Sequence, residues 1–98
     1  MIYVGIDIAS EKHDYFMLQA ETGIVFNRSS VTISNSVDGY KKLHTDFSAF
    51  RGATGDSNVR IGFESTGIYH TNIIHFLLEQ NYNVMMINPI LTNMARKA

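Results

Sequence analysis

The sequence of 98 residues contains no cysteine, which excludes a disulfide framework, a thiol nucleophile and a zinc site built on cysteine. It also has no apolar run long enough to span a bilayer, and its first residues lack the basic region of a signal peptide. We therefore expect a cytoplasmic protein that does not contact a membrane. With 45% apolar and 17% charged residues, the composition is typical of one folded globular domain.

An excess of basic residues is also missing, since the formal net charge is −1 at pH 7. A free-standing module that binds nucleic acid usually carries a basic stripe. Here the only basic pairs are Lys41-Lys42 and Arg96-Lys97. If this domain meets DNA or RNA, we expect other parts of a longer protein to supply most of the phosphate contacts.

The apolar pattern predicts elements in the order β-β-β-α-β-α-β-α. Short connections make the first three strands an antiparallel meander, and each strand–helix–strand crossover leaves its two strands parallel. We therefore predict an α/β fold with a mixed five-stranded sheet flanked by helices, as in the ribonuclease H-like arrangement. The predicted strands are 2–8, 15–18, 24–26 continued by Val31 and Ile33, 59–63, and 83–87. The predicted helices follow Ser34-Asn35-Ser36 with an apolar stripe of Val37, Tyr40, Leu43, Phe47 and Phe50, follow Ser65-Thr66-Gly67, and begin at Pro89.

The first and last predicted strands, 2–8 and 83–87, are apolar without alternation. This pattern is typical of a strand covered on both faces, so we expect both to be buried and Met85-Met86 to belong to the core. One carboxylate, Asp7, interrupts the first strand. A charge in such a strand is costly unless another group pairs with it or it ligates a metal.

Glu64 ends the fourth predicted strand. In the ribonuclease H-like arrangement that strand lies parallel beside the first, which would place Asp7 and Glu64 together at the edge where ligands bind in open α/β sheets. Two adjacent carboxylates repel unless a proton or cation lies between them, and Mg²⁺ favours oxygen ligands. The pair suits half of a two-metal site for phosphodiester chemistry. The alternative is that Asp7 caps a turn and Glu64 accepts hydrogen bonds at the next helix N-terminus.

Other polar residues near Glu64 have two interpretations. Ser65-Thr66-Gly67 is expected to cap the second helix, although free N–H groups at a helix N-terminus can also hold a phosphate. His70 follows in the first turn and is a candidate contact to a phosphate or to whatever Glu64 binds. His13 and His44 are expected in a turn and on a helix surface.

Two motifs carry a family resemblance. They are Gly5-Ile-Asp-Ile-Ala-Ser-Glu-Lys-His-Asp14 and Gly62-Phe-Glu-Ser-Thr-Gly-Ile-Tyr-His70, followed by Asn88-Pro89. Together they resemble the opening of the DEDD-type insertion-sequence transposases, a family with an N-terminal RuvC-like domain that includes the Piv-type DNA invertases. The first motif alone is common among ribonuclease H-like and actin-like proteins. The second motif, at its proper place in the strand and helix order, makes the resemblance specific.

The resemblance implies a DNA recombinase that uses Mg²⁺ or Mn²⁺, with Asp7 and Glu64 as the first two acids of the family's tetrad. The other two acids, a close Asp pair, follow the helix that begins at Asn-Pro, and no Asp or Glu follows Glu79. Residues 1–98 would then be the N-terminal part of a RuvC-like catalytic domain, truncated before the last two acids and inactive alone. In members of the family, the position matched to Ser10 is often Lys, so the resemblance assigns no role to Ser10.

The resemblance also implies partners, namely DNA and a guide RNA from the same mobile element. Exposed edge residues and a cut-off terminal helix favour a homodimer, because both leave apolar surface to cover.

Two other interpretations stay open. One is a non-catalytic RuvC-like interaction module whose carboxylates are relics. The other is a fragment of an actin-like ATPase or sugar kinase, which would need glycine and hydroxyl residues in the first hairpin to approach nucleotide phosphates. The turn here, Ile8-Ala-Ser-Glu-Lys12, has no glycine and includes an acidic residue. Stabilisation of the fold by ATP would favour that interpretation.

Overall fold

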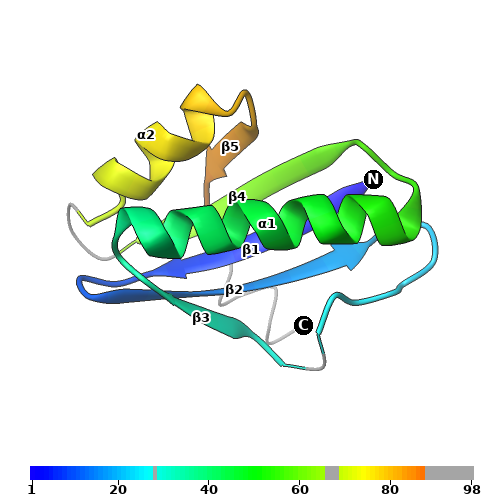
Figure 1. The fold of residues 1–98 in the computed structure, drawn as a ribbon, viewed down its shortest axis with the longest axis horizontal. Helices are drawn as coiled ribbons and strands as arrows, with labels where there is room; N and C mark the ends of the chain where they lie inside the picture. Colours follow the sequence, from blue (N-terminus) through cyan, green and yellow to red (C-terminus); the bar gives the residue numbers. More distant parts are fainter. Residues whose placement is uncertain (28, 66–68, 88–98) are drawn as a thin grey trace.

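The computed structural model describes residues 1–27, 29–65 and 69–87. The predicted helix from Pro89 lies outside these residues. Within these described ranges, five strands and two helices follow one another (Figure 1). They are β1 (Ile2–Ile8), β2 (Lys12–Gln19), β3 (Val31–Ser34), α1 (Val37–Thr54), β4 (Val59–Ser65), α2 (Thr71–Glu79) and β5 (Asn83–Met86).

The strands form one mixed sheet in the order β3-β2-β1-β4-β5. β2 pairs antiparallel with both β1 and β3, and β4 pairs parallel with both β1 and β5. The predicted meander, the two crossovers and the α/β class are thereby confirmed. Residues 24–26 do not belong to β3, because Val25 makes only an isolated bridge to Leu18.

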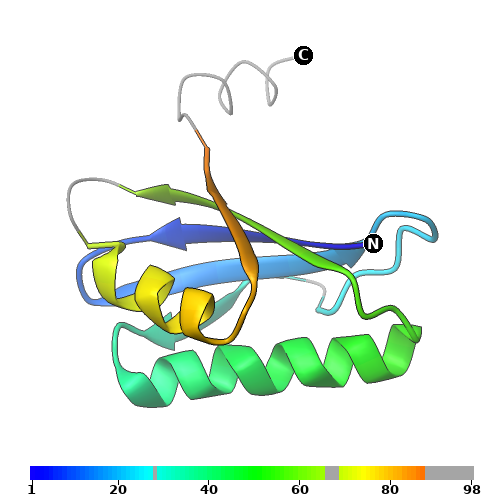
Figure 2. The same ribbon diagram turned by 90° about the horizontal axis from the view of Figure 1, so that it is seen from above.

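Both helices lie on the same side of the sheet (Figure 2). We call this side the helix-covered face and the opposite side the second face. One apolar core fills the space between the sheet and the two helices. Its strand residues are Ile2, Val4, Ile6, Ile8, Tyr15, Met17, Ile33, Val59, Ile61 and Phe63, and its helix residues are Tyr40, Leu43, Phe47, Phe50, Ile73 and Leu77.

Only one face of β1 is buried by the described residues, which corrects the prediction that both faces are buried. Every second residue from Ile2 to Ile8 is at most 3% exposed, whereas Tyr3 is 44% exposed and Asp7 is also exposed. The alternation is hard to see in the sequence because Tyr3 counts as apolar and Gly5 has no side chain. A strand with this pattern builds the core with one face and presents different chemistry on the other.

β5 is also exposed, so the prediction that it is buried was wrong. Met85 is 68% exposed and Met86 is 58% exposed, and neither belongs to the core. β5 has four residues and lies at the edge of the sheet, paired only with β4. An apolar run in the sequence does not reveal whether the strand is central or lies at an edge, and here the edge position leaves the methionines uncovered.

α1 begins where the polar cluster predicted it. Ser36 is the N-cap residue, and its side chain accepts a hydrogen bond from the backbone N–H of Gly39. The predicted stripe is buried except for Val37, which is 60% exposed. The helix ends at Thr54.

The C-terminal end of α1 lies at Gly55, which adopts the left-handed conformation at φ 71° and donates its N–H to a carbonyl one turn earlier. Within the described ranges, neither α1 nor α2 combines the length and apolar character needed to cross a membrane.

Candidate functional site

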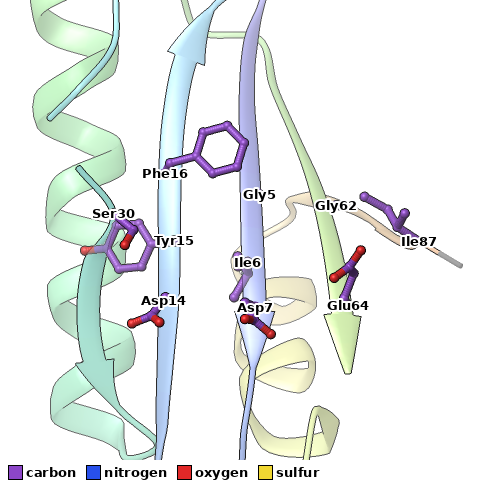
Figure 3. Close-up of a pocket in the computed structure, with 10 residues that line it drawn as sticks. All are labelled: Gly5, Ile6, Asp7, Asp14, Tyr15, Phe16, Ser30, Gly62, Glu64 and Ile87. Carbon is purple, nitrogen blue, oxygen red and sulfur yellow. The ribbon is translucent and has the colours of Figure 1, made fainter. Parts of the chain in front are cut away.

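Asp7 and Glu64 lie side by side near the C-terminal ends of two parallel strands. In the register of β1 against β4, Asp7 is the direct partner of Glu64. Directly paired residues project from the same face of a sheet, so both carboxylates lie on the second face (Figure 3). The neighbouring placement expected from the sequence is confirmed by the parallel pairing of β1 with β4.

A cavity of about 410 Å³ opens on the second face at this pair (Figure 3). Its floor includes Gly5 and Gly62, which are register partners one pleat away from the two acids. A Cβ atom at Gly5 would lie 2.5 Å from the Phe16 ring, and one at Gly62 would lie 2.4 Å from the Ile87 side chain. The described lining residues are Gly5, Ile6, Asp7, Asp14, Tyr15, Phe16, Ser30, Gly62, Glu64 and Ile87.

One oxygen of the acid pair is buried without compensation. Glu64 Oε1 is inaccessible to solvent and has no hydrogen-bond partner among the residues that the structure describes. A carboxylate oxygen withdrawn from water without a donor is costly, and a cation would remove that cost. Oxygen ligands are those that Mg²⁺ prefers, so the two acids fit such an ion. In the described part of the chain, no group of three or more acids, histidines or cysteines could hold a metal.

Asp14 extends the acids into a row across the sheet, which the sequence analysis did not recognise. It is the direct antiparallel partner of Asp7, lines the same cavity and accepts a hydrogen bond from the Thr32 hydroxyl. The tight connection between β1 and β2 was the available signal, because a hairpin pairs residues at equal distances on either side of its turn. Ser30 and Phe16 at the cavity were also missed.

The expected helix cap is not where it was predicted. Ser65 belongs to β4, Thr66 lies outside the described residues, and α2 begins only at Thr71 with His70 in the N-cap position. The His70 side chain makes no capping hydrogen bond. β4 simply extends further than its apolar run, because parallel pairing with β1 continues through Ser65.

The His70 ring lies away from the acid pair. It stacks on the Phe63 ring with 5.6 Å between ring centroids and 28° between ring planes. Phe63 is a core residue on the helix-covered face, whereas Glu64, the next residue, lies on the second face. The structure therefore does not bring the His70 ring beside the carboxylates.

Two histidines differ from expectation. His13, expected in a turn, is a residue of β2 and is 0% exposed. It points into the helix-covered face, as its register partner Ile8 does. His44 is half-buried rather than free on the helix surface, and its Nδ1 shares a hydrogen bond of 2.9 Å with the Tyr82 hydroxyl.

The topology and the acid pair define an α/β domain of the RuvC type, and solved structures agree. RuvC from Thermus thermophilus in complex with a Holliday junction substrate matches 97% of this chain and 69% of its own, with a TM-score of 0.60 and 10% identity. A second T. thermophilus RuvC structure matches 91% of this chain and 64% of its own, with a TM-score of 0.53 and 13% identity. These likenesses show the ribonuclease H-like fold.

The family follows from the sequence itself. The profile of the IS110-type DEDD transposases matches residues 4–98, and the chain belongs to this transposase family. The resemblance drawn from the two motifs is thus confirmed, and the family is one of nuclease-type enzymes that act in DNA transposition. RuvC-like nucleases of the DEDD class generally use divalent metals. No curated protein sequence matches the chain.

Proposed function

We propose that residues 1–98 form the N-terminal part of a catalytic domain that cleaves DNA phosphodiester bonds and joins strands during transposition, using Mg²⁺ or Mn²⁺ held by Asp7 and Glu64. One observation carries the proposal. The two carboxylates are direct register partners at a cavity, and one oxygen of Glu64 is buried with no hydrogen-bond partner among the described residues. Membership of the transposase family and the RuvC structure with its Holliday junction substrate support DNA as the substrate.

The chain's own part in this chemistry is to place negative oxygens on a rigid support. A divalent cation, when bound, stabilises charge on the attacking and leaving oxygens of a phosphodiester. The spacing of Asp7 and Glu64 is set by the pairing of two central strands rather than by a flexible loop. Asp14 adds a third negative charge on the side of β2.

We also propose that a further acid pair is needed for cleavage. The family tetrad has four acids, and the two paired here account for the first two. Residues 1–98 alone should then bind metal weakly and leave DNA intact. A guide RNA from the same element and a homodimer belong to the same proposal. The RNA rests on the family resemblance, and the dimer on the exposed edge strand β5.

The test is Mn²⁺ binding measured by calorimetry and by the electron spin resonance signal of the free ion. Asp7→Asn and Glu64→Gln should each weaken binding by about tenfold or more, the range in which even indirect partners act on metal affinity. Asp38→Asn is the matched control, because Asp38 is an exposed acid in the first turn of α1 and lies outside the cavity. Binding that is equal in all four proteins would refute the proposal and favour the interaction module.

A further inference from the structure

A buried histidine lies behind the acid row, and the proposed chemistry does not use it. His13 is adjacent to Asp14 in β2, but its side chain is fully enclosed on the helix-covered face. Its Nδ1 accepts a hydrogen bond of 3.3 Å from the backbone N–H of Ala9. Its Nε2 is buried and has no hydrogen-bond partner among the described residues.

The hydrogen bond from Ala9 identifies the protonation state of the ring. A nitrogen that accepts a hydrogen bond carries no proton, so the neutral ring has its proton on Nε2. A doubly protonated ring has no acceptor, and the bond to Ala9 would be lost. Burial lowers the pKa of His13, while the Asn35 side chain and the carboxylates of Asp14 and Asp7 oppose that shift. The neutral ring is therefore the form that this site favours.

The turn that contains Ala9 is held from a second side by Asn35. The Asn35 side-chain amide donates to the Ser10 carbonyl at 2.9 Å, and its backbone N–H donates to the Glu11 carbonyl at 2.8 Å. Each residue of the turn 9–11 thus has a backbone group bound by His13 or Asn35.

Tyr40 of α1 ties these two residues together. Its hydroxyl donates to Asn35 Oδ1, and its ring lies nearly parallel to the His13 ring at 6.4 Å between centroids. We call His13, Asn35 and Tyr40 the turn clamp. The turn clamp connects the turn 9–11 to α1 through the Tyr40 side chain. A movement of the turn would therefore have to displace the contacts of Tyr40 with Asn35 and His13.

The position of this turn matters for the acids. It begins two residues after Asp7 and leads directly into the strand that carries Asp14. A shift of one residue in the pairing of a strand would move every side chain to the opposite face. In β1 such a shift would place Asp7 in the apolar core and remove it from the cavity that it shares with Glu64. A turn bound at each residue prevents that shift.

We propose that His13 is a positioning residue, whose neutral ring fixes the turn 9–11 and thereby holds Asp7 in register beside Glu64. The assignment of a role in metal binding rests on the proposed function. The fixing of the turn can be measured without any metal.

The experiment uses two substitutions of His13 and one control. His13→Phe keeps an aromatic ring but removes the acceptor, and His13→Asn keeps an acceptor close to the position of Nδ1. Met17→Ala is the matched control, because Met17 is a core residue of the same strand and face, 1% exposed, and does not contact the turn through any hydrogen-bonding side chain. The measurements are nitrogen-15 NMR of the His13 ring, hydrogen exchange at the Ala9 amide, and Mn²⁺ affinity.

In the parent protein near neutral pH, the ring proton should be on Nε2 and the Ala9 amide should be protected from exchange. His13→Phe should lose this protection and about tenfold in Mn²⁺ affinity, the range for partners that orient a ligand. His13→Asn should restore most of both, and Met17→Ala should lower stability while leaving both unchanged. If His13→Phe fails to fold, His13→Leu, which also removes the acceptor, replaces it in the comparison.

A ring proton on Nδ1 in the parent protein would overturn the inference. So would His13→Phe, or His13→Leu in its place, showing the same Ala9 protection and Mn²⁺ affinity as Met17→Ala. Another result would distinguish failure of the proposed function from failure of this inference. If the parent protein shows no Mn²⁺ binding that depends on Asp7, the metal site fails, while the ring spectrum and the Ala9 amide still test whether His13 holds the turn.

Discussion

The two faces of the sheet are built from alternate residues of the same strands, yet they differ in almost every physical respect. On the helix-covered face, Ile6 and Tyr15 are 3% and 1% exposed and belong to one continuous core. On the second face, their neighbours Asp7 and Asp14 are exposed carboxylates, and Phe16 is 53% exposed. One face determines the stability of the fold, and the other can carry charge because it does not have to be packed.

The difference extends to how polar groups are satisfied. The buried hydroxyl of Tyr15 donates to the Asp46 carboxylate, which also accepts from Lys42 at 3.2 Å. At the cavity of the second face, by contrast, Glu64 Oε1 is buried with no partner in the described ranges. The helix-covered face therefore satisfies its buried polar group within the fold, whereas the second face leaves one unsatisfied among the described residues.

The largest effect should come from matched phenylalanines on opposite faces. Phe47→Ala removes a core ring that is 1% exposed and should lower the free energy of unfolding by about 3 to 5 kcal/mol. Phe16→Ala removes a ring that is 53% exposed and should cost about 1 kcal/mol or less. Denaturant unfolding of both variants measures the difference. Equal losses would mean that the second face is packed as tightly as the core.

An intermediate effect is expected from matched hydroxyl groups bound to carboxylates. Tyr15→Phe removes a buried donor to Asp46 and should destabilise the protein by about 1 to 2 kcal/mol, since hydrogen bonds to charged groups are among the stronger ones. Thr32→Val removes the exposed donor to Asp14, which water can replace, and should change stability by about 0.5 kcal/mol or less. Thermal unfolding followed by circular dichroism compares the two. A larger loss in Thr32→Val would contradict the distinction between the faces.

The smallest expected effect is a dependence of the free energy of unfolding on pH, which comes from His13. In the described strands, His13 is the only buried histidine. Burial lowers the pKa of His13 below its ordinary value of 6.5, so the unfolded chain binds a proton at a higher pH than the folded protein does. The contribution of His13 to the free energy of unfolding is fully present above pH 6.5. It is lost as the pH falls from there through the lowered pKa of the folded protein.

Unfolding titrations of the parent protein and of His13→Phe, between pH 7.5 and about 5, isolate this contribution because His44, His70 and His75 are present in both. The parent protein should lose more stability on acidification than the variant does. Parallel curves would show that His13 binds a proton equally well in the folded and unfolded states, against the clamped neutral ring.

The local sequence pattern was sufficient to predict the order of the strands and helices within the described residues. The spacing from Tyr40 to Phe50 predicted α1. The adjacency of Asp7 and Glu64 was predicted from the ribonuclease H-like arrangement, in which the fourth strand lies parallel beside the first, and the register of β1 against β4 confirms it. Their role as metal ligands stays a prediction until metal binding is measured.

Other residues could not be placed in this way. His13 looked like part of a turn because polar residues surround it, yet it is enclosed by Tyr40 and the strands beside it. Met85 and Met86 looked like core because they are apolar, yet they lie on an edge strand. In both cases the side chain's own character says nothing about which element covers it.

The family, the two candidate acids and the order of the described strands and helices could be inferred from the sequence, because they depend on local periodicity and short motifs. The three-dimensional fold was needed to show that the described residues bury only one face of β1, that Asp14 pairs with Asp7, and that His13 is buried with its ring hydrogen-bonded to Ala9. Each of these depends on which residues meet across strands and against a helix. Such contacts are set by register and packing between distant segments, and a pattern read along one segment does not contain them.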